Sequence, residues 1–412
     1  MTLPYQNLPH VQAAQGFAHF EGVQVLDLST SVAGPYATQL LADFGATVLK
    51  IEKPGTGDDA RQWGPPFLNG ASLWFLSVNR NKQSMALDIS QPEGLELLLS
   101  LLETTDVLVV NMTPRVQEKL GLNFAKLQER FPRLIHASLT GFGLTGSRSD
   151  HPCYDLIAEG YSGIMDLTGE SENDPQKVGT PAADMLAGQD LAMAVMAAIH
   201  GRVRTGKGSS IDISMLATMT RFTAPRVVAY LGSDEVPRRS GGKDSVIAIY
   251  QVFNTADSQL SLGLGNDAIW KRFWQAVGDP AFAEKPEYAG NAGRRTHRPA
   301  IVARISQVLA TKPRDEWLAL FAKNRIPAGP INRVDEVTKD QDLLTKEFFY
   351  KSDSGYGEVP QVGLGITIDG KHHVHRKAPP TLGEDTEAIL RERLKLSPAQ
   401  IAQLLQAKIV NE

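Results

Sequence analysis

The sequence predicts an α/β fold built from a large, doubly wound, Rossmann-like domain and a smaller α+β domain. Over roughly the first 225 residues, short β-rich apolar runs alternate with amphipathic helical segments. These runs are almost continuously apolar, as is typical of parallel strands covered on both faces. The chain has 412 residues, which is more than the roughly 250 to 300 residues that one hydrophobic core can serve.

The first strand–helix–strand unit predicts how the larger domain begins. The run VQVLDLS at 23–29 predicts a strand, and a helix follows from Pro35, whose missing N–H is harmless in a first turn. The run TVLKIE at 47–52 predicts the next strand. Further strands are predicted for MALDI at 85–89, DVLVVNM at 106–112 and LIHASLTGF at 134–142, with intervening helices from Pro92 and near 123–131.

The second half of the chain has a different pattern. From about Val236, short alternating strands and helices rich in aromatic residues predict the smaller α+β domain. Dense proline and glycine at 326–330 indicate a linker, and a capping box at Ser397–Gln400 predicts a C-terminal helix. We therefore expect a large domain of residues 1–225 plus 340–412 and a small domain of residues 226–339.

Composition excludes several classes of protein. With 42% hydrophobic residues, 21% charged residues and a net charge of -4, the chain shows no nucleic-acid-binding surface. The single cysteine, Cys153, cannot form an internal disulfide, and no signal peptide precedes the first strand. The longest apolar stretch, Leu191–Ile199, is shorter than the roughly 20 residues of a membrane span. We expect a cytoplasmic protein with no membrane partner.

Two basic clusters are candidates for an anion site. Lys50 and Lys53 with Arg61 follow the second strand, and Asn79-Arg80-Asn81-Lys82 precede the third. Solvated charged loops explain them equally well. Glu52 ends the second strand where a ribose-binding acid often lies, but the segment STSVAGP lacks the glycine fingerprint of a dinucleotide site.

Asp184 is the strongest candidate for chemistry. It lies between small residues in GTPAADMLAG, at the start of a helix rich in alanine, methionine and leucine. A helix N-terminus favours an ionised carboxylate, and a carboxylate in a pocket can serve as a covalent nucleophile. The alternative from composition alone is a helix N-cap.

Metal and serine-hydrolase sites find little support. His372, His373 and His375 have no carboxylate spaced with them, and neither H-E-x-x-H nor G-x-S-x-G occurs. We expect no metal site.

Several of these segments together resemble the family III CoA-transferases, which are related to the α-methylacyl-CoA racemases. The matches occur in order along almost the whole chain, which is more specific than any one motif. They are VLDLSTSVAGPYATQLLADFGATVLKIEKPGTGD, SLWFLSVNRNKQSMALDIS, YDLIAEGYSGIMDLTG, VGTPAADMLAG, RTGKGSSIDISM, IPAGPINRVDEV and APPTLGEDTEAIL.

The resemblance implies CoA transfer between carboxylic acids, with Asp184 as the nucleophile. In this family the aspartate attacks an acyl-CoA thioester, and mixed anhydrides and an aspartyl-CoA thioester follow. Coenzyme A is then a substrate, and no permanently bound cofactor is implied. CoA would bind on the large domain at Val32, Ala33, Lys53, Leu87, Ser90, Asn111, Met112, Lys119 and Tyr154, and the substrate pocket would include Asp59, Trp63, Gly241 and Gly242.

Tyr154 separates the two related activities. The racemases have a catalytic histidine at that position, and a neutral tyrosine cannot replace it as a base near pH 7. Transfer is therefore favoured, an acyl-CoA racemase or epimerase is the alternative, and a catalytically silent acyl-CoA-binding protein is a third. Departures from the family occur at Asn111–Arg115, at Pro152 and in the shortened glycine-rich loop Ser240–Lys243.

The resemblance also implies an interlocked homodimer in which each chain threads the other. The proline- and glycine-rich linkers on both sides of the predicted small domain are compatible with that arrangement.

Overall fold

The computed structural model describes residues 2–14, 16–372 and 374–411. It divides into two compact units, which are described separately below: unit 1 contains residues 1–164, 178–229 and 341–412, and unit 2 contains residues 165–177 and 230–340. His373, one of the three histidines considered above, lies outside the described residues.

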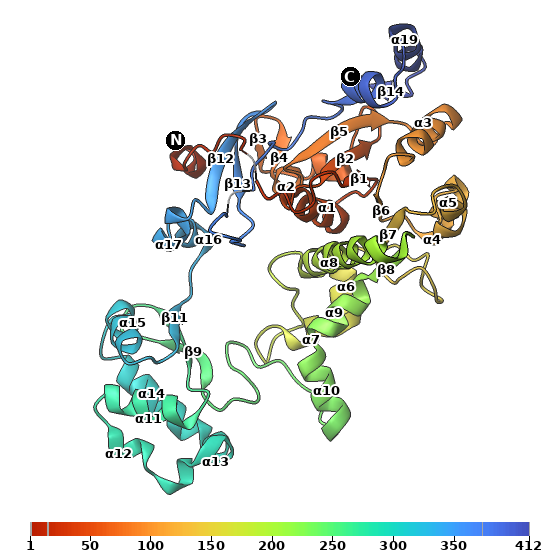
Figure 1. The fold of residues 1–412 in the computed structure, drawn as a ribbon. Coiled ribbons are helices and arrows are strands. Elements are labelled where there is room, and N and C mark those ends of the chain that lie inside the picture. Colours follow the sequence, from red (N-terminus) through yellow and green to blue (C-terminus); the bar gives the residue numbers. More distant parts are fainter. Residues whose placement is uncertain (1, 15, 373, 412) are drawn as a thin grey trace. The chain divides into compact units, whose positions relative to one another are not determined.

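A seven-stranded sheet forms the centre of unit 1 (Figure 1). Its order is β14-β5-β2-β1-β6-β7-β8, and every neighbouring pair is parallel except β14 with β5. The strands are β1 (Gln24–Asp27), β2 (Thr47–Glu52), β5 (Lys82–Leu87), β6 (Val107–Val110), β7 (Ile135–Thr140), β8 (Ser210–Ser214) and β14 (Val410–Asn411).

Helices cover both faces of this sheet, because alternate strand residues point into two separate cores. Val25, Val107 and Val109 belong to one core and Leu26, Leu108 and Val110 to the other. The first core is closed by α1 (Ala33–Asp43), α6 (Asp155–Ser162), α8 (Ala182–Thr205) and α9 (Met215–Phe222). The second is closed by α3 (Pro92–Leu102), α5 (Phe124–Arg130), η4 (Ile389–Arg393) and α19 (Pro398–Gln406), while α4 (Pro114–Leu120) precedes α5.

The prediction of a mainly parallel sheet between two layers of helices is confirmed. The least accurate boundary is that of β5, which begins at Lys82 and ends at Leu87, whereas 85–89 was predicted. Its first residues are polar, but Lys82 and Ser84 are buried and hydrogen-bonded. The strand was predicted to begin too late because its first residues are polar, and polar residues are uncommon in a buried strand.

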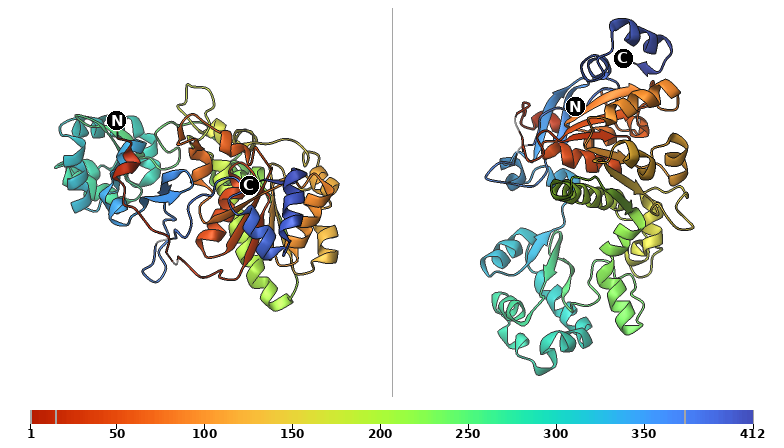
Figure 2. Two further views of the ribbon diagram at one scale, coloured as in Figure 1. Left: turned by 90° about the horizontal axis from the view of Figure 1, so that it is seen from above. Right: turned by 45° about the vertical axis from the view of Figure 1, so that its right-hand side comes forward.

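The C-terminal residues complete the edge of the sheet. Strand β14 pairs antiparallel with β5, and α19 precedes it. These C-terminal residues are dark blue in Figure 2. The predicted capping box is present, because the Ser397 hydroxyl accepts a hydrogen bond from the Gln400 N–H. The other elements of unit 1 are η1 (Pro4–Asn7), η2 (Asp59–Gln62), β3 (Phe67–Leu68), β4 (Ala71–Ser72), α2 (Leu73–Ser77), α17 (Gln341–Thr345), β12 (Phe349–Ser354), β13 (Gly357–Val362) and α18 (Thr386–Ala388).

Unit 2 has its own hydrophobic core, built from a small antiparallel sheet and aromatic-rich helices. Trp270, Phe273, Trp274 and Phe321 are fully buried in it. Its strands are β9 (Tyr250–Asn254), β10 (Gln259–Gly263) and β11 (Ala328–Pro330), and its helices are α11 (Asp267–Ala276), α12 (Pro280–Ala283), η3 (Pro286–Tyr288), α13 (Gly290–Thr296), α14 (Arg298–Leu309), α15 (Arg314–Lys323) and α16 (Val334–Val337). Helices α7 (Ile164–Leu167) and α10 (Ala224–Ser233) contain residues of both units.

Among the described residues, helix α8 alone is long and apolar enough to cross a membrane by length and composition. Its residues Ala183, Ala187 and Leu191 pack in the first core of unit 1.

Candidate active site

Asp184 is the third residue of α8, and its side chain is partly buried. The N-cap interpretation is wrong, because Pro181 occupies the N-cap position. No hydrogen-bond donor among the described residues reaches the Asp184 carboxylate. The side chain thus lies in the first turn of a partly buried helix, and its oxygens accept no hydrogen bond from the described residues.

Asp155 controls the surroundings of Asp184. Its Oδ1 accepts hydrogen bonds from the backbone N–H groups of Ala183 (2.8 Å) and Asp184 (3.2 Å). Burial, and after it the negative charge of Asp155, raises the pKa of Asp184 from 3.8 to about 7. The helix N-terminus therefore does not hold the pKa of Asp184 low, contrary to expectation, because the Asp155 carboxylate already accepts from the first-turn N–H groups of that helix.

Sequence reasoning missed Asp155 entirely. It lies 29 positions before Asp184, in the first turn of α6, next to the predicted CoA contact Tyr154. Tyr154 is the N-cap residue of α6, and its side chain is 63% exposed. The acid directly after a predicted pocket tyrosine was the only signal in the sequence.

Cys153 also lies in the electrostatic range of Asp184. Burial, with the charge of Asp184, raises the pKa of the Cys153 thiol to about 11. The thiol therefore stays protonated near neutral pH and is no competing nucleophile.

Val32 and Ala33 lie at the start of α1, which packs against α8. A Cβ atom on Gly188 would lie 2.6 Å from the Ala33 carbonyl oxygen, so the two helices touch where α8 has no side chain. Gly188 follows Asp184 by one helical turn. Two of the predicted CoA contacts therefore lie close to the candidate nucleophile.

Most of the other predicted CoA contacts lie at the carboxyl ends of neighbouring strands, where ligands of open α/β sheets usually bind, whereas Lys119 lies in the last turn of α4. Lys53 follows β2, Ser90 follows β5, and Asn111 and Met112 follow β6. Lys53, Ser90 and Lys119 of α4 are exposed. The Leu87 side chain is buried in the second core and the Asn111 amide is bonded to the backbone of Thr30, so neither side chain is free for a ligand.

Four of the basic residues proposed as anion ligands are committed elsewhere, so that prediction is wrong for them. Lys50, Arg80 and Lys82 are buried and Arg61 is partly buried, and each pairs with a buried carboxylate, as the cost of desolvating a charge requires. The pairs are Lys50 with Asp58 (2.8 Å), Arg61 with Glu52 (2.7 Å), Arg80 with Asp43 (2.5 Å) and Lys82 with Asp27 (3.2 Å). Glu52 is likewise no ribose ligand, and of the two clusters only Lys53 remains exposed.

The predicted substrate-pocket residues fall into two groups. Asp59 and Trp63 lie in and after η2 of unit 1, where the Trp63 ring meets Trp74 edge to face at 5.9 Å. Gly241 and Gly242 belong to unit 2, in the loop between α10 and β9. Gly241 has φ 61°, in the left-handed region that favours glycine. A Cβ there would lie 2.2 Å from the Glu170 carboxylate, which would have to move.

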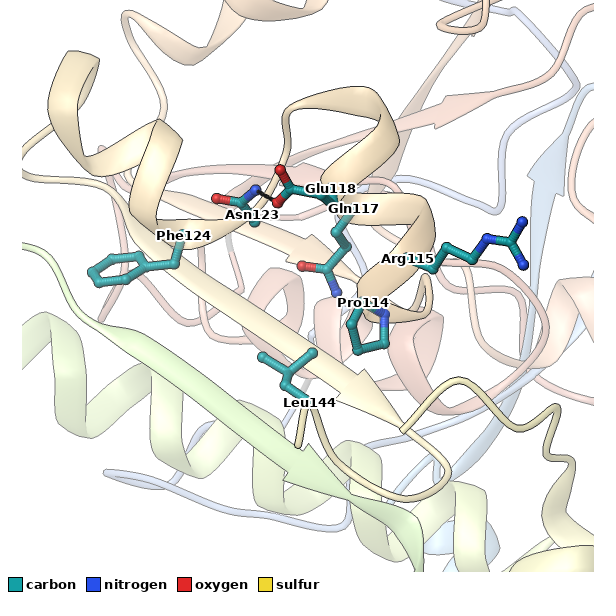
Figure 3. Close-up of a pocket in the computed structure, with 7 residues that line it drawn as sticks. All are labelled: Pro114, Arg115, Gln117, Glu118, Asn123, Phe124 and Leu144. Carbon is teal, nitrogen blue, oxygen red and sulfur yellow. Dashed lines mark hydrogen bonds between the residues drawn. The ribbon is translucent and has the colours of Figure 1, made fainter. Parts of the chain in front are cut away.

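One cavity in unit 1 does not include Asp184 among its lining residues. It has a volume of about 360 Å³ and is lined by Pro114, Arg115, Gln117, Glu118, Asn123, Phe124 and Leu144. Figure 3 shows the Arg115 guanidinium directed away from the other lining side chains, while Asn123 and Glu118 bond each other. None of the predicted CoA contacts lines this cavity.

One group of described side chains has metal-like spacing: His10, Asp353 and Glu358 place ligand atoms within 4.8 Å of one another. His10 and Asp353 are exposed, and Lys351 Nζ already lies 3.0 Å from Glu358. The paired ammonium disfavours a cation there.

Comparisons with known proteins agree with the motifs. The profile of CoA-transferase family III matches residues 20–386. A succinyl-CoA:glutarate CoA-transferase of Mus musculus is 35% identical over 393 residues, covering 95% of this chain and 90% of the relative. A succinate–glutarate CoA-transferase of Agrobacterium fabrum is 35% identical, covering 90% of this chain and 94% of the relative. The crystal structure of a CAIB/BAIF family protein from Brucella suis has a TM-score of 0.80 and 35% identity, covering 93% of this chain and 100% of that one.

Proposed function

Since the chain belongs to CoA-transferase family III and is an enzyme that transfers CoA, we propose that Asp184 carries the CoA between an acyl-CoA and a small carboxylic acid. The observation that supports this role is the Asp184 carboxylate itself. It is partly buried, no described donor bonds it, and burial together with the charge of Asp155 raises its pKa to about 7. Near neutral pH a substantial fraction is therefore ionised and available as a nucleophile.

The proposed reaction has four steps that use no water. The Asp184 carboxylate attacks the thioester carbonyl, which releases CoA thiolate and leaves a mixed anhydride. The thiolate attacks the Asp184 carbonyl, which forms an aspartyl-CoA thioester and releases the donor acid. The acceptor carboxylate then attacks that thioester, and the released thiolate attacks the acceptor's acyl carbon in the new anhydride. This last step frees Asp184 and yields the new acyl-CoA.

Each attack on a carbonyl creates an oxyanion that needs donors. The first-turn N–H groups of Ala33 and Gly34 donate to no described group, since α1 has no side-chain cap. They lie on the helix that touches α8 one turn after Asp184. We propose that they stabilise these oxyanions.

The donor and acceptor are proposed to be small dicarboxylates, with succinyl-CoA as donor and glutarate as acceptor. Support comes from the two relatives, whose names give succinyl-CoA or succinate together with glutarate. Arg61 and Arg80 offer no second-carboxylate site, because both are paired with buried acids.

CoA is proposed to bind along the carboxyl edge of the unit 1 sheet, with the exposed Lys53 and Lys119 near its phosphates. In this proposal residues 1–225 plus 340–412 form the CoA-binding domain and residues 226–339 the small domain.

We further propose that the enzyme is an interlocked homodimer. Unit 1 exposes large apolar side chains from α6, α8, α9 and α10, a pattern typical of an interface. They are Leu156 (47%), Ile157 (43%), Tyr161 (55%), Met193 (58%), Phe222 (53%) and Val228 (65%).

The test is CoA exchange by wild-type protein and by Asp184→Asn. Wild-type protein should convert succinyl-CoA and labelled glutarate into labelled glutaryl-CoA, and Asp184→Asn should lose about 10⁴-fold or more in kcat. Glu129→Gln, an exposed carboxylate on α5, is the matched control. Deuterium exchange at the α-carbon of a branched acyl-CoA without CoA transfer would instead support the racemase alternative.

A further inference from the structure

The loop between β1 and α1, residues 28–32, is held by polar side chains that bond the backbone of three successive residues, Ser29, Thr30 and Ser31. The Ser29 N–H donates to Asp27 Oδ1 (2.9 Å), and the Lys50 ammonium donates to the Ser29 carbonyl (2.6 Å). The Asn111 amide accepts from the Thr30 N–H (3.2 Å) and donates to the Thr30 carbonyl (2.9 Å).

Ser31, the next residue, has an unusual backbone. Its φ is 73°, in the left-handed region that an L residue with a side chain adopts at a cost in strain. Such a conformation persists only where the surroundings impose it. In this loop Asp58 does so, because its Oδ1 accepts from the Ser31 N–H at 2.8 Å.

Asp58 is itself held in place from two sides. Its Oδ1 also accepts from the Ala60 N–H at 2.9 Å, and its Oδ2 lies 2.8 Å from the Lys50 ammonium. Both side chains of this ion pair are fully buried. Lys50 also donates to the Ser29 carbonyl. The Lys50–Asp58 ion pair therefore bonds the loop backbone on both sides of Thr30, at Ser29 and at Ser31.

The position of this loop matters for the proposed chemistry. Val32 begins α1 directly after Ser31, and the Ala33 carbonyl lies against Gly188 of α8, one turn after Asp184. A change in the backbone at Ser31 therefore shifts the first turn of α1 relative to the carboxylate and to the free N–H groups of Ala33 and Gly34.

We propose that Asp58, supported by Lys50, is a positioning residue for CoA transfer: it holds Ser31 in the left-handed conformation and thereby sets the first turn of α1 beside Asp184. This proposal rests on the proposed role of Asp184. It differs from a merely stabilising ion pair, because removal of the Ser31 strain should restore activity that the loss of Asp58 removes.

The test combines Asp58→Ala with Ser31→Gly, because glycine adopts φ near 73° without the side-chain penalty. Asp58→Ala should lower kcat about 10- to 100-fold with a smaller change in KM, as expected for misplaced catalytic groups. Adding Ser31→Gly should recover at least about fivefold of that loss. Amide hydrogen exchange at residues 30–34 should quicken in Asp58→Ala and slow again in the double variant.

Asp43→Asn is the matched control, since Asp43 is an equally buried partner of Arg80 that does not touch the loop. Ser31→Gly should rescue nothing in that background. Should Asp58→Ala fail to fold, Asp58→Asn, which keeps one acceptor oxygen, replaces it in the same comparison.

The proposal is overturned if Ser31→Gly restores no activity to the Asp58 variant, or if the amides of residues 30–34 exchange no faster in that variant than in Asp43→Asn. A wild-type protein that transfers no CoA would refute the proposed function instead. Amide hydrogen exchange at residues 30–34 would still test whether Asp58 fixes the backbone of the loop.

Discussion

Replacing Asp184 by asparagine is expected to stabilise the folded protein at alkaline pH. The folded state raises the pKa of Asp184 from 3.8 to about 7, so between these values the folded protein retains a proton that the unfolded chain releases. Stability associated with this group is therefore complete below the unfolded value and is lost as the pH rises through about 7. Asparagine has nearly the same shape as aspartic acid and does not ionise. The Asp184→Asn variant therefore keeps this stability as the pH rises.

The magnitude follows from the two pKa values. The interval from 3.8 to about 7 corresponds to at most about 4 kcal/mol of unfolding free energy at roughly pH 8, and to about 2 kcal/mol at roughly pH 5. Urea unfolding of wild-type protein and Asp184→Asn at both pH values measures this difference. Glu129→Gln, an exposed carboxylate, should show no such pH-dependent gain.

Two results would refute this reasoning. One is an Asp184→Asn variant that is no more stable than wild-type protein at roughly pH 8. The other is a gain that does not shrink toward acidic pH. Either result would mean that the folded protein does not raise the pKa of Asp184. The proposal that this carboxylate is partly protonated near neutral pH would then be wrong.

Three further predictions concern the same unit. Asp155→Asn should lower the midpoint of the rising limb of the pH–kcat profile by about one pH unit, because the repelling charge is lost while the amide oxygen still accepts the helix N–H groups; steady-state kinetics across pH measure it. Gly188→Ala should lower kcat at least about tenfold by forcing α1 away from α8, whereas Gly201→Ala on the same helix, where nothing lies within 4 Å, should leave kcat unchanged in the same assay. Arg80→Ala should cost about 3 to 5 kcal/mol in urea unfolding because it leaves a buried carboxylate unpaired, against less than about 1 kcal/mol for Lys126→Ala, whose ion pair is exposed.

The order of strands and helices was predictable because each run of the large sheet is locally apolar and bounded by helical spacing. The family was predictable for a related reason: its motifs occur in order along the chain, and the match to residues 20–386 confirms it. The relatives also exclude the silent binding protein, since they are named as CoA-transferases.

The basic residues of strands β2 and β5 were wrongly predicted to bind an anion, although the position of Lys50 in the sequence already indicates burial. Lys50 lies inside the apolar run TVLKIE, and a lysine in a strand covered on both faces must be paired. Its partner, Asp58, lies in the following loop, beside Asp59, which was predicted to line the substrate pocket.

The state of Asp184 could not be predicted from its own segment. It depends on burial and on Asp155, which the fold brings to the helix start from 29 positions away. The cap position likewise depends on the backbone of Pro181, which residue type alone does not reveal.

The most direct test of the central claim is the mass of the protein after incubation with succinyl-CoA alone. We predict CoA bound as a thioester to the peptide that contains Asp184, and release of this CoA as a new acyl-CoA when an acceptor acid is added. An unmodified Asp184 peptide, together with CoA exchange that persists in Asp184→Asn, would contradict the account.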